Sequence, residues 1–468
     1  MSLALDVYRR LPAPLQGLAA SLRGYQLRRW RYGPETDQLT AEAREREHWS
    51  ESEWNAWYAL HLPRLLDRAV TRVPWYRDHW AERRRVGDRA SSAYLENWPV
   101  LEKDVLRATP ERFLADDCDP RRMFLERTSG TTGKSTTLWW SQQTVREWYA
   151  LFEARCRNWY GVTRHDRWAI IGGQLVTPAS RQRPPFWVWN SALNQLYMSA
   201  WHLAPRNIPA YLEAIERHRI RYLFAYSSAI YTLAEAIRAQ GLRPPRLEVL
   251  ITNAEPVHAH QREVIEAAFG APLRETYGMS EIVTTATECE ARRLHIWPEV
   301  GIVEVIDDGV AVPDGLVGDL VCTGLVNTDM PLVRYRVGDR AARRAPGAPC
   351  PCGRTMPEFA AIEGRSDDLV VTADGRRIGQ LQAVFQAVST VSEAQIIQES
   401  FDRFRIIVTP RPGFDDSARA QIIARFRDRV GDVSVTVDAV DSIPRTANGK
   451  LRYVVSQLTP EQRAVHAP

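Results

Sequence analysis

Two glycine-rich segments of this chain carry a lysine in a setting suited to phosphate binding. They are Thr128-Ser-Gly-Thr-Thr-Gly-Lys-Ser135 and Pro444-Arg-Thr-Ala-Asn-Gly-Lys450. Glycine lets a backbone approach a ligand closely, and neighbouring hydroxyl and amide groups donate hydrogen bonds to phosphate oxygens. Lysine is rare, since Lys103, Lys134 and Lys450 are the only three among 61 basic residues. The first segment therefore predicts a phosphate-binding loop, and a polar hairpin is the alternative.

This first loop is not a Walker A motif, because that motif requires glycine where the chain has Thr128. We expect Lys134 to flank the phosphates only. Lys103 lies outside any phosphate-type segment and is predicted to be structural. The donors expected from the loop are Thr128, Ser129, Gly130, Thr131, Thr132 and Gly133.

Four side chains that can bind a metal occur in two close pairs. Cys289 and His295 form one pair, and Cys350 and Cys352 follow about 55 residues later. Three thiolates and one imidazole would complete a closed tetrahedral zinc site. Cysteines separated by one residue are less diagnostic than those separated by two, so reduced core cysteines are the alternative. The remaining thiols are predicted to lie in the core: Cys118, Cys156 and Cys322.

Composition narrows the class of protein. The net charge is only +4 over 468 residues, and 57 acidic residues are interleaved with the arginines, which disfavours nucleic-acid binding. Six cysteines without a secretory hydrophobic stretch indicate a reducing compartment, so we predict a cytoplasmic protein. There is no run of about 18 apolar residues that would span a membrane. The basic amphipathic stretch from Leu3 to Arg31 is typical of a weak membrane-surface contact or of docking on the protein itself, and we favour the second.

The elements that position these residues follow from the hydrophobic pattern. Residues 1–95 are predicted to be mainly helical. From Met123 to about Glu363, short apolar runs alternate with helical segments, which predicts parallel strands with crossover helices, an α/β fold. The apolar runs are Trp168–Ile171, Tyr222–Phe224 and Leu247–Ile251, and the helical segments include Ile208–Arg217 and His258–Phe269.

After Gly364 the pattern becomes strand, helix, strand, strand, helix, strand. The second helix is well marked, because Asp415 or Asp416 can cap it and Ile422, Phe426 and Val430 share one face. We therefore predict a large multi-layer domain over residues 1–364 and a small α+β domain over residues 365–468.

Five segments in order resemble the core motifs of the adenylate-forming superfamily, which includes acyl-CoA synthetases, peptide-synthetase adenylation domains and luciferases. Besides the two glycine-rich segments they are Thr276-Tyr-Gly-Met-Ser-Glu281, Arg334-Tyr-Arg-Val-Gly-Asp339 and Glu363-Gly-Arg-Ser-Asp-Asp368. Three further features, Asn253-Ala-Glu-Pro256, the threonine-rich loop and the Cys-Pro-Cys-Gly-Arg run, resemble most the phenylacetate-CoA ligase branch and its relatives in polysaccharide gene clusters. The resemblance covers about residues 95–455.

The resemblance implies a role for each matching residue. Lys450 would reach from a mobile small domain to the α-phosphate, and Glu281 would bind Mg²⁺. Asp339 would accept hydrogen bonds from the ribose, with Arg365 beside the ribose and α-phosphate. Asp367 would lie at the hinge, with Asp368 next to it. The nucleotide pocket would be formed by Ala254, Glu255, Tyr277, Gly278 and Ser280.

The activity implied is ATP-dependent adenylation of a carboxylic acid, followed by acyl transfer to CoA. ATP, Mg²⁺ and CoA would be the cofactors, and zinc is expected to be structural, as in some relatives. The alternatives are acyl transfer to an amine, a hydroxyl or a carrier-protein thiol, and a non-catalytic nucleotide-binding scaffold. Lys450, Glu281 and Asp339 disfavour the scaffold. For the acid pocket we expect Gln174, Tyr226 and Ser227, with tryptophans that are either pocket or core: Trp139, Trp140, Trp187, Trp189 and Trp201.

Overall fold

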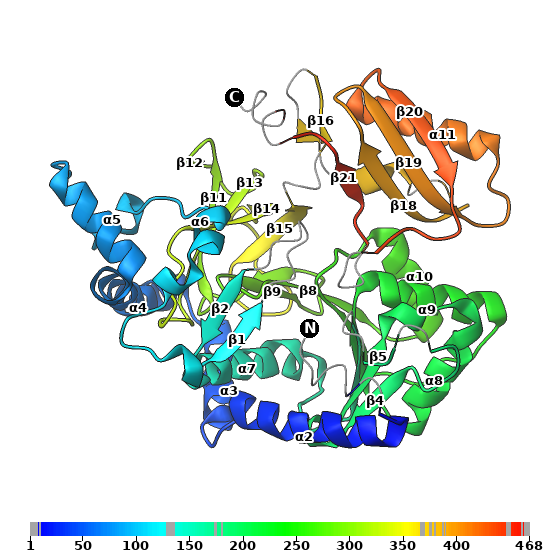
Figure 1. Ribbon diagram of the computed structural model, residues 1–468, viewed down its shortest axis with the longest axis horizontal. Helices are drawn as coiled ribbons and strands as arrows, with labels where there is room; N and C mark the ends of the chain where they lie inside the picture. Colours follow the sequence, from blue (N-terminus) through cyan, green and yellow to red (C-terminus); the bar gives the residue numbers. More distant parts are fainter. Residues whose placement is uncertain are drawn as a thin grey trace.

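The chain forms a large unit and a smaller C-terminal unit built on its own sheet (Figure 1). This computed structural model describes residues 8, 11–127, 136–172, 176–178, 181–365, 370–373, 377–378, 381–385, 388, 390–445, 451–459 and 462. The arrangement confirms the predicted α/β class with one large and one small unit.

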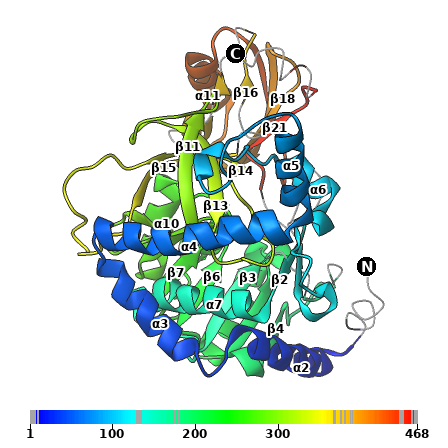
Figure 2. The same ribbon diagram turned by 90° about the vertical axis from the view of Figure 1, so that its left-hand side faces the viewer.

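Helices near the N-terminus cover one side of the large unit. They are α2 (Ala13–Arg31), α3 (Thr36–Glu45), α4 (Glu51–Arg72) and α5 (Pro74–Arg85) (Figure 2). Ser50 begins α4 with a capping box, in which its hydroxyl accepts from the Glu53 amide and the Glu53 carboxylate accepts from the Ser50 amide. Within the described chain, no helix combines the length and apolar character that crossing a membrane requires.

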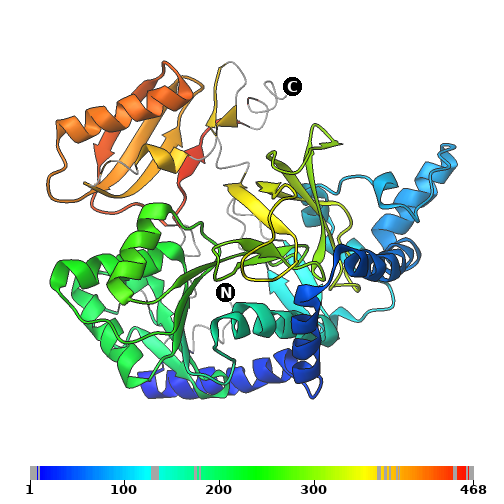
Figure 3. The same ribbon diagram turned by 180° about the vertical axis from the view of Figure 1, so that it is seen from behind.

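The centre of the large unit is a sheet whose strand order is β12-β11-β13-β14-β15-β10-β9-β8-β7-β6-β3-β5-β4. Its parallel part comprises β3 (Trp168–Gly172), β5 (Gln195–Ser199), β6 (Tyr222–Ala225), β7 (Val249–Thr252) and β8 (Leu273–Gly278). The helices α8 (Ile208–Arg217), α9 (Ser227–Gln240) and α10 (Ala259–Phe269) lie against this part (Figure 3). The predicted strands near residues 168, 222 and 249 and both predicted helices are therefore confirmed.

The rest of the sheet is antiparallel and begins at β8, which pairs in parallel with β7 but antiparallel with β9 (Thr285–Glu288). Beyond β9 lie β10 (Leu294–Ile296), β15 (Glu358–Arg365), β14 (Tyr335–Arg343), β13 (Gly318–Gly324), β11 (Gly301–Asp307) and β12 (Val310–Ala311). The edge strand beside β5 is β4 (Trp187–Asn190), and it too is antiparallel. Because the next element, β9, pairs antiparallel with β8, no crossover helix follows the carboxyl end of β8.

The phosphate-type loop is flanked by a separate two-stranded ribbon. In it, β1 (Phe124–Arg127) pairs with β2 (Thr137–Trp140), and Arg127 lies opposite Thr137. The two ends of the loop are thereby held together. Helix α7 (Gln142–Cys156) follows the ribbon and packs against α3.

The small unit has a four-stranded sheet of order β20-β19-β18-β21. Its strands are β18 (Val391–Gln398), β19 (Arg403–Pro410), β20 (Ser434–Ala439) and β21 (Val454–Ser456). Helix α11 (Asp416–Val430) is capped by Asp415, whose carboxylate accepts from the Ala418 amide at 2.9 Å. As predicted, Ile422, Phe426 and Val430 form the buried face of α11, in a core separate from those of the large unit.

The first part of the small unit differs from the predicted strand and helix. In the described residues it contains the short hairpin β16 (Val370–Val371) and β17 (Arg377–Ile378), followed by the single 3-10 turn η10 (Leu381–Val384). Val388 and Val391 follow this turn closely and are both buried.

Candidate functional site

The nucleotide-type motifs meet at the carboxyl edge of the parallel strands. Asn253, Ala254 and Glu255 follow β7, and Met279 to Glu281 follow β8, its neighbour in the sheet. Ligand sites of open α/β sheets lie at this edge, where the direction of the connections changes. Ala254 has a φ of +60°, a left-handed conformation that non-glycine residues adopt at a cost. Gly278 ends β8, and a Cβ there would lie 2.8 Å from the Thr285 hydroxyl oxygen.

Tyr277 and Asp339 are brought together from β8 and β14. The Tyr277 hydroxyl donates to Asp339 Oδ2 at 2.6 Å. Burial and the neighbouring Asp339 carboxylate raise the pKa of Tyr277 well above its ordinary value. The ring of Phe359 on β15 meets the Tyr277 ring edge-on, with centroids 5.7 Å apart. The tyrosine predicted to line the nucleotide pocket is thus hydrogen-bonded to the carboxylate predicted to bind the ribose.

Glu281 is buried and has two partners in the large unit. The Tyr335 hydroxyl donates to Glu281 Oε1 at 2.9 Å, and Lys103 Nζ lies 3.4 Å from the same oxygen. Lys103 is the first residue of α6 (Lys103–Ala108), and its ammonium also faces the Tyr335 ring, 6.0 Å from the centroid. A cation therefore contacts the carboxylate that was predicted to hold Mg²⁺.

Lys103 contacts a predicted site residue, a contact that the motif pattern did not predict. It was predicted to be structural because no glycine-rich segment surrounds it, but the fold brings it to the predicted magnesium ligand. The one sequence signal that could have identified it is compositional. Because 58 of the 61 basic residues are arginines, each of the three lysines is a candidate for a position that requires an ammonium group and not a guanidinium group.

Glu255 connects three parts of the chain through its buried carboxylate. Its Oε2 accepts from the Ser228 amide at 3.0 Å, at the start of α9, and from the Ser227 hydroxyl at 3.4 Å. The positive end of the helix dipole stabilises a carboxylate at this position. Its Oε1 accepts from the Leu451 amide of the small unit at 3.4 Å. Leu451 directly follows Lys450 in the sequence, so the end of the last motif adjoins the nucleotide motif after β7.

Several predicted site residues lie outside the described residues. For Arg365 only the backbone is described; it pairs with Asp339 across β14 and β15. Ser280 is half-buried between Gly278 and Glu281. Those for which no structure is described are Thr128, Ser129, Gly130, Thr131, Thr132, Gly133, Lys134, Gln174, Asp367, Asp368 and Lys450.

Glu275 precedes these residues on β8 and is the most strongly perturbed carboxyl group nearby. Burial, and secondarily the Glu288 carboxylate on β9, raise its pKa to about 7, although Arg262 on α10 opposes this. Glu275 lines a cavity of about 430 Å³ together with Val257, Phe359 and Ile362. This cavity reaches Pro256, the last residue of the motif that follows β7.

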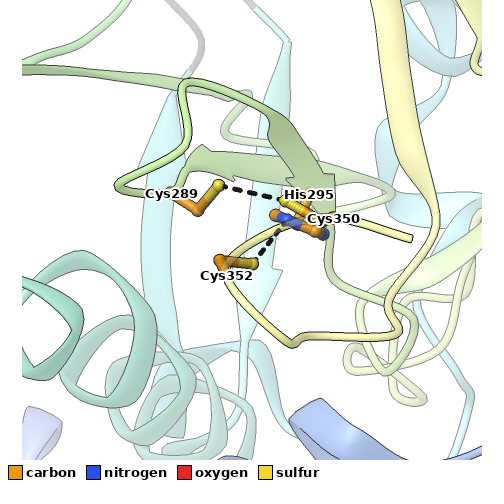
Figure 4. Close-up of side chains that lie close together, drawn as sticks. All are labelled: Cys289, His295, Cys350 and Cys352. Carbon is orange, nitrogen blue, oxygen red and sulfur yellow. Dashed lines mark hydrogen bonds between the residues drawn. The ribbon is translucent and has the colours of Figure 1, made fainter. Parts of the chain in front are cut away.

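The predicted metal ligands converge (Figure 4). The ligand atoms of Cys289, His295, Cys350 and Cys352 all lie within 4.8 Å of one another. Cys289 Sγ is 3.6 Å from Cys350 Sγ, and Cys352 Sγ is 3.4 Å from His295 Nε2. The sulfur separation is too long for a disulfide and matches two thiolates on one tetrahedral zinc ion. His295 Nδ1 contacts the Met356 carbonyl at 3.2 Å, which directs Nε2 to the thiols.

The loop that carries Cys350 and Cys352 also anchors the N-terminal helices. Arg354 forms ion pairs with Glu47 at 3.2 Å and with Glu290 at 2.9 Å, and stacks over the Trp159 ring. The Thr355 amide donates to the Glu47 carbonyl at 3.1 Å. Of the remaining cysteines, Cys156 and Cys322 are buried as predicted. Cys118 is only half-buried, because it lies beside Arg68 and Asp117 near the surface.

An apolar cavity of about 440 Å³ lies between α2, α7 and one face of the parallel strands. Its aromatic lining comes from Trp148, Tyr149 and Phe152 of α7 and from Phe224 and Tyr197 of the sheet.

The residues expected for an acid pocket are not those that line this cavity. Tyr226 and Ser227 begin α9, and the tryptophans described in full lie elsewhere: Trp139 and Trp140 are in the core, Trp187 packs on Tyr211, and Trp189 stacks on His218. The side chain of Trp201 is outside the described part. Packing of α2 and α7 on the sheet creates this cavity, and an acid pocket at Gln174, Tyr226 and Ser227 stays a prediction.

Comparison with known families and proteins gave consistent matches. Residues 78–328 match the family model described as AMP-binding enzyme, and residues 370–457 match the CapK C-terminal domain. Protein CapK of Staphylococcus aureus is 23% identical over 381 residues, which cover 80% of this chain and 82% of that protein. Phenylacetate-coenzyme A ligase of Thermus thermophilus is 30% identical over 274 residues, which cover 52% of this chain and 61% of that enzyme. The enzyme of that name from Pseudomonas putida is 29% identical, covering 65% and 69%.

Among solved structures, 2-hydroxyisobutyryl-CoA ligase has the same fold. Its crystal structure in the postadenylation state, in complex with R3-HIB-AMP, gives a TM-score of 0.65 at 20% identity, over 90% of this chain and 92% of that one. The same protein with 2-HIB-AMP and CoA in the thioesterification state gives 0.54 at 22% identity, over 88% and 91%. The predicted resemblance is confirmed at the level of family and fold.

Proposed function

Because this chain belongs to the AMP-binding enzyme family, whose model matches more than half of its length, we propose that it activates a carboxylic acid with ATP and transfers the acyl group to CoA. In the first half-reaction a carboxylate oxygen bonds to the α-phosphorus while the bond to pyrophosphate breaks. In the second, the CoA sulfur bonds to the acyl carbon, AMP leaves with the electrons of the C–O bond, and the thiol proton passes to solvent.

The observation that carries this proposal is the hydrogen bond between Leu451 and Glu255. It brings the residue next to Lys450 against the motif that follows β7. Adenylation concentrates negative charge on the phosphates, so a cation delivered by the small unit would stabilise the transition state. The contact supports an arrangement competent for the first half-reaction.

The other residues have complementary roles in this proposal. Asp339, held by Tyr277, accepts from the ribose hydroxyls, and Arg365 on the paired strand lies beside the ribose. Residues 128–133 bind the β- and γ-phosphates. Glu281 holds Mg²⁺, a hard cation that prefers carboxylate oxygens and supplies charge neutralisation at the phosphates. Lys103 adds a second positive charge beside Glu281.

The acid's apolar part would occupy the cavity under α2 and α7. The cavity reaches Ile251 on β7, three positions before Ala254. Its volume and aromatic lining support an acid with a large apolar or aromatic group.

The test is acid-dependent exchange of labelled pyrophosphate into ATP, over a panel of short, aromatic and long-chain acids, with and without CoA. We expect exchange with apolar acids, and thiol consumption when CoA is present. Failure of every acid to support exchange would refute adenylation.

A variant separates the two half-reactions. Lys450→Ala is expected to slow exchange by about 100-fold or more, yet to leave thioester formation from supplied acyl-AMP largely intact. Equal loss of both would contradict the assignment of Lys450 to adenylation alone and the swing of a mobile small domain between the two steps.

A second candidate keeps adenylation but changes the acceptor to an amine, a hydroxyl or a carrier-protein thiol. Its support is that Protein CapK, whose name specifies no CoA, aligns over 80% of this chain, more than the two phenylacetate-coenzyme A ligases named above. Exchange without any consumption of CoA would support this candidate over the first.

We also propose that Cys289, His295, Cys350 and Cys352 bind one structural zinc ion. The supporting observations are the converging ligand atoms and the orientation of His295 by the Met356 carbonyl. All four positions are filled by protein ligands, so the site is closed and suits a structural role.

A further inference from the structure

The outer face of α2 is apolar and exposed. Leu15, Leu18, Leu22 and Tyr25 are between 47% and 61% exposed. Their spacing of three and four residues places them on one side of the helix. Four of the large apolar side chains exposed in the described chain therefore lie together on one helical face. Single exposed apolar side chains are common on protein surfaces, but a contiguous group of them indicates an interaction site.

The charged residues of the same helix are all arginines. Residues 7–34 contain six arginines and no acidic residue, although acids occur throughout the rest of the chain. Arg28 and Arg29 are exposed, and within the described part of the chain neither forms an ion pair. Arg29 lies four residues after Tyr25, on the apolar face itself. Unpaired guanidinium groups among exposed leucines favour an anionic, partly apolar partner.

A cationic pocket of about 590 Å³ opens at the C-terminal end of α2. It is lined by Arg28, Arg29, Arg31 and Tyr25 of the helix and by Arg164 and His165 near β3. Asp37 neutralises Arg164 at 2.6 Å, so the excess charge comes mainly from the helix. None of the described lining residues is acidic. Such a pocket has the donor groups that a phosphate requires.

We propose that the outer face of α2 binds the surface of an anionic lipid bilayer. The leucines and Tyr25 insert among the acyl chains, and Arg28 and Arg29 contact lipid phosphates. A second copy of the chain is a poorer partner, because a twofold interface would pair this face with itself and the helix has no acidic residue to meet its arginines. Helix α2 lies on the side of the large unit away from the small unit, so the small unit stays clear of the bilayer (Figure 1).

The inner face of α2 adds to this proposal. Ala19, Ala20 and Leu27 line the apolar cavity, so one helix separates that cavity from the outside. Docking on a bilayer would bring the cavity next to a source of apolar acids. This consequence rests on the proposed function, whereas docking itself does not.

The experiment is co-sedimentation of the full chain with vesicles of phosphatidylcholine, alone or mixed with phosphatidylglycerol, at low and physiological salt. We expect binding to the mixed vesicles only, and weaker binding at higher salt. Leu18→Glu with Leu22→Glu should lower the partition constant by at least about 100-fold. Arg28→Gln with Arg29→Gln should lower it about 25-fold, since each basic residue near an anionic surface contributes about fivefold.

Matched controls use equally exposed residues elsewhere. Leu60→Glu with Leu316→Glu, and Arg121→Gln with Arg122→Gln, should bind like the unmodified chain. A thermal melt of each variant confirms that it folds. The proposal would be overturned if the chain did not bind anionic vesicles. It would also be overturned if the control substitutions weakened binding as much as the substitutions in α2. A leucine variant that converts a dimer to a monomer in gel filtration would overturn it as well, because the face would then be a self-interface.

Discussion

At the scale of single residues, the pairing of Lys103 with Glu281 is the contact with the most direct bearing on chemistry. The two residues are distant in the sequence, yet their charged atoms are 3.4 Å apart. Tyr335 donates to the same carboxylate oxygen, so removal of Lys103 would leave Glu281 hydrogen-bonded but without a cation. An ammonium can remain beside the carboxylate or turn to a phosphate, because its donors rotate freely.

Lys103→Ala is therefore expected to slow pyrophosphate exchange by about 10- to 100-fold, through lost stabilisation of phosphate charge. Lys103→Arg should retain part of the rate. The measurement is exchange at saturating acid over a range of Mg²⁺ and ATP concentrations. An unchanged rate in Lys103→Ala would show that the lysine only holds Glu281 in the absence of nucleotide.

Glu275 gives a pH-dependent prediction. Its pKa rises from 4.5 to about 7 through burial and the Glu288 carboxylate. The folded state therefore holds the proton more tightly than the unfolded state between these values. This contribution to stability is complete below pH 4.5 and is lost as the pH rises through about 7.

Glu275→Gln should accordingly raise the melting temperature by about 2–4 °C at pH 8 and change it little at pH 5. Differential scanning calorimetry of both proteins at these two pH values is the measurement. Glu263→Gln, on the neighbouring helix α10, serves as the control. A gain of equal size at both pH values would mean that ionisation of Glu275 is not responsible.

At the scale of elements, the cysteine loop ties the N-terminal helices to the sheet. The segment around Glu47 is held by Arg354 and Thr355, which lie two and three residues after Cys352 of the proposed metal site. Zinc would fix the loop and, through it, the connection between α3 and α4. A structural ion can therefore influence helices that contain none of its ligands.

Cys352→Ser should lose about one equivalent of zinc per chain and lower the melting temperature by roughly 5 °C or more. Hydrogen exchange should accelerate around residues 46–48, the 3-10 turn that follows α3. Cys118→Ser, which lies outside the cluster, should retain the metal. Identical metal content in Cys352→Ser and the unmodified chain would refute the site.

The elements that the sequence predicted correctly are those defined by local signals. β3, α8, α10 and α11 combine apolar periodicity with caps or chain breakers, and the convergence of Cys289, His295, Cys350 and Cys352 follows from the few residue types that can bind zinc. Lys103 and the cavity under α2 depend on packing between distant segments, for which the sequence pattern carries no local signal. For the first helix expected in the small unit, the described residues show only the 3-10 turn η10.

At the scale of the whole molecule, the two units meet beside the nucleotide motifs. Arg411, which directly follows β19, forms an ion pair with Glu235 of α9 at 2.7 Å and donates to the Tyr231 hydroxyl. Tyr453 packs edge-on against His258. These contacts hold the small unit where Leu451 reaches Glu255. The division at residues 364 and 365 stays a prediction, which limited proteolysis can test.

Arg411→Glu should weaken this docking and slow pyrophosphate exchange about fivefold, in line with a partly exposed ion pair. Thioester formation from supplied acyl-AMP should be unaffected if the small unit turns away for that step. Adding Glu235→Arg should restore exchange, and a double-mutant cycle measures the coupling. No recovery in the double variant would exclude the ion pair as the cause.

The pairing of β15 with β10 has a consequence for the order of folding. Because β15 joins β14 and β10, the Tyr277–Asp339 bond and the cysteine cluster both require contacts between segments far apart in the chain. Such contacts form late, after the entropy of closing long loops has been overcome. Nucleotide binding should then recover after most secondary structure during refolding, and simultaneous recovery would contradict this order. An AMP-binding signal would thereby report completion of the whole sheet, and ATP would slow the opening of its last-formed strands.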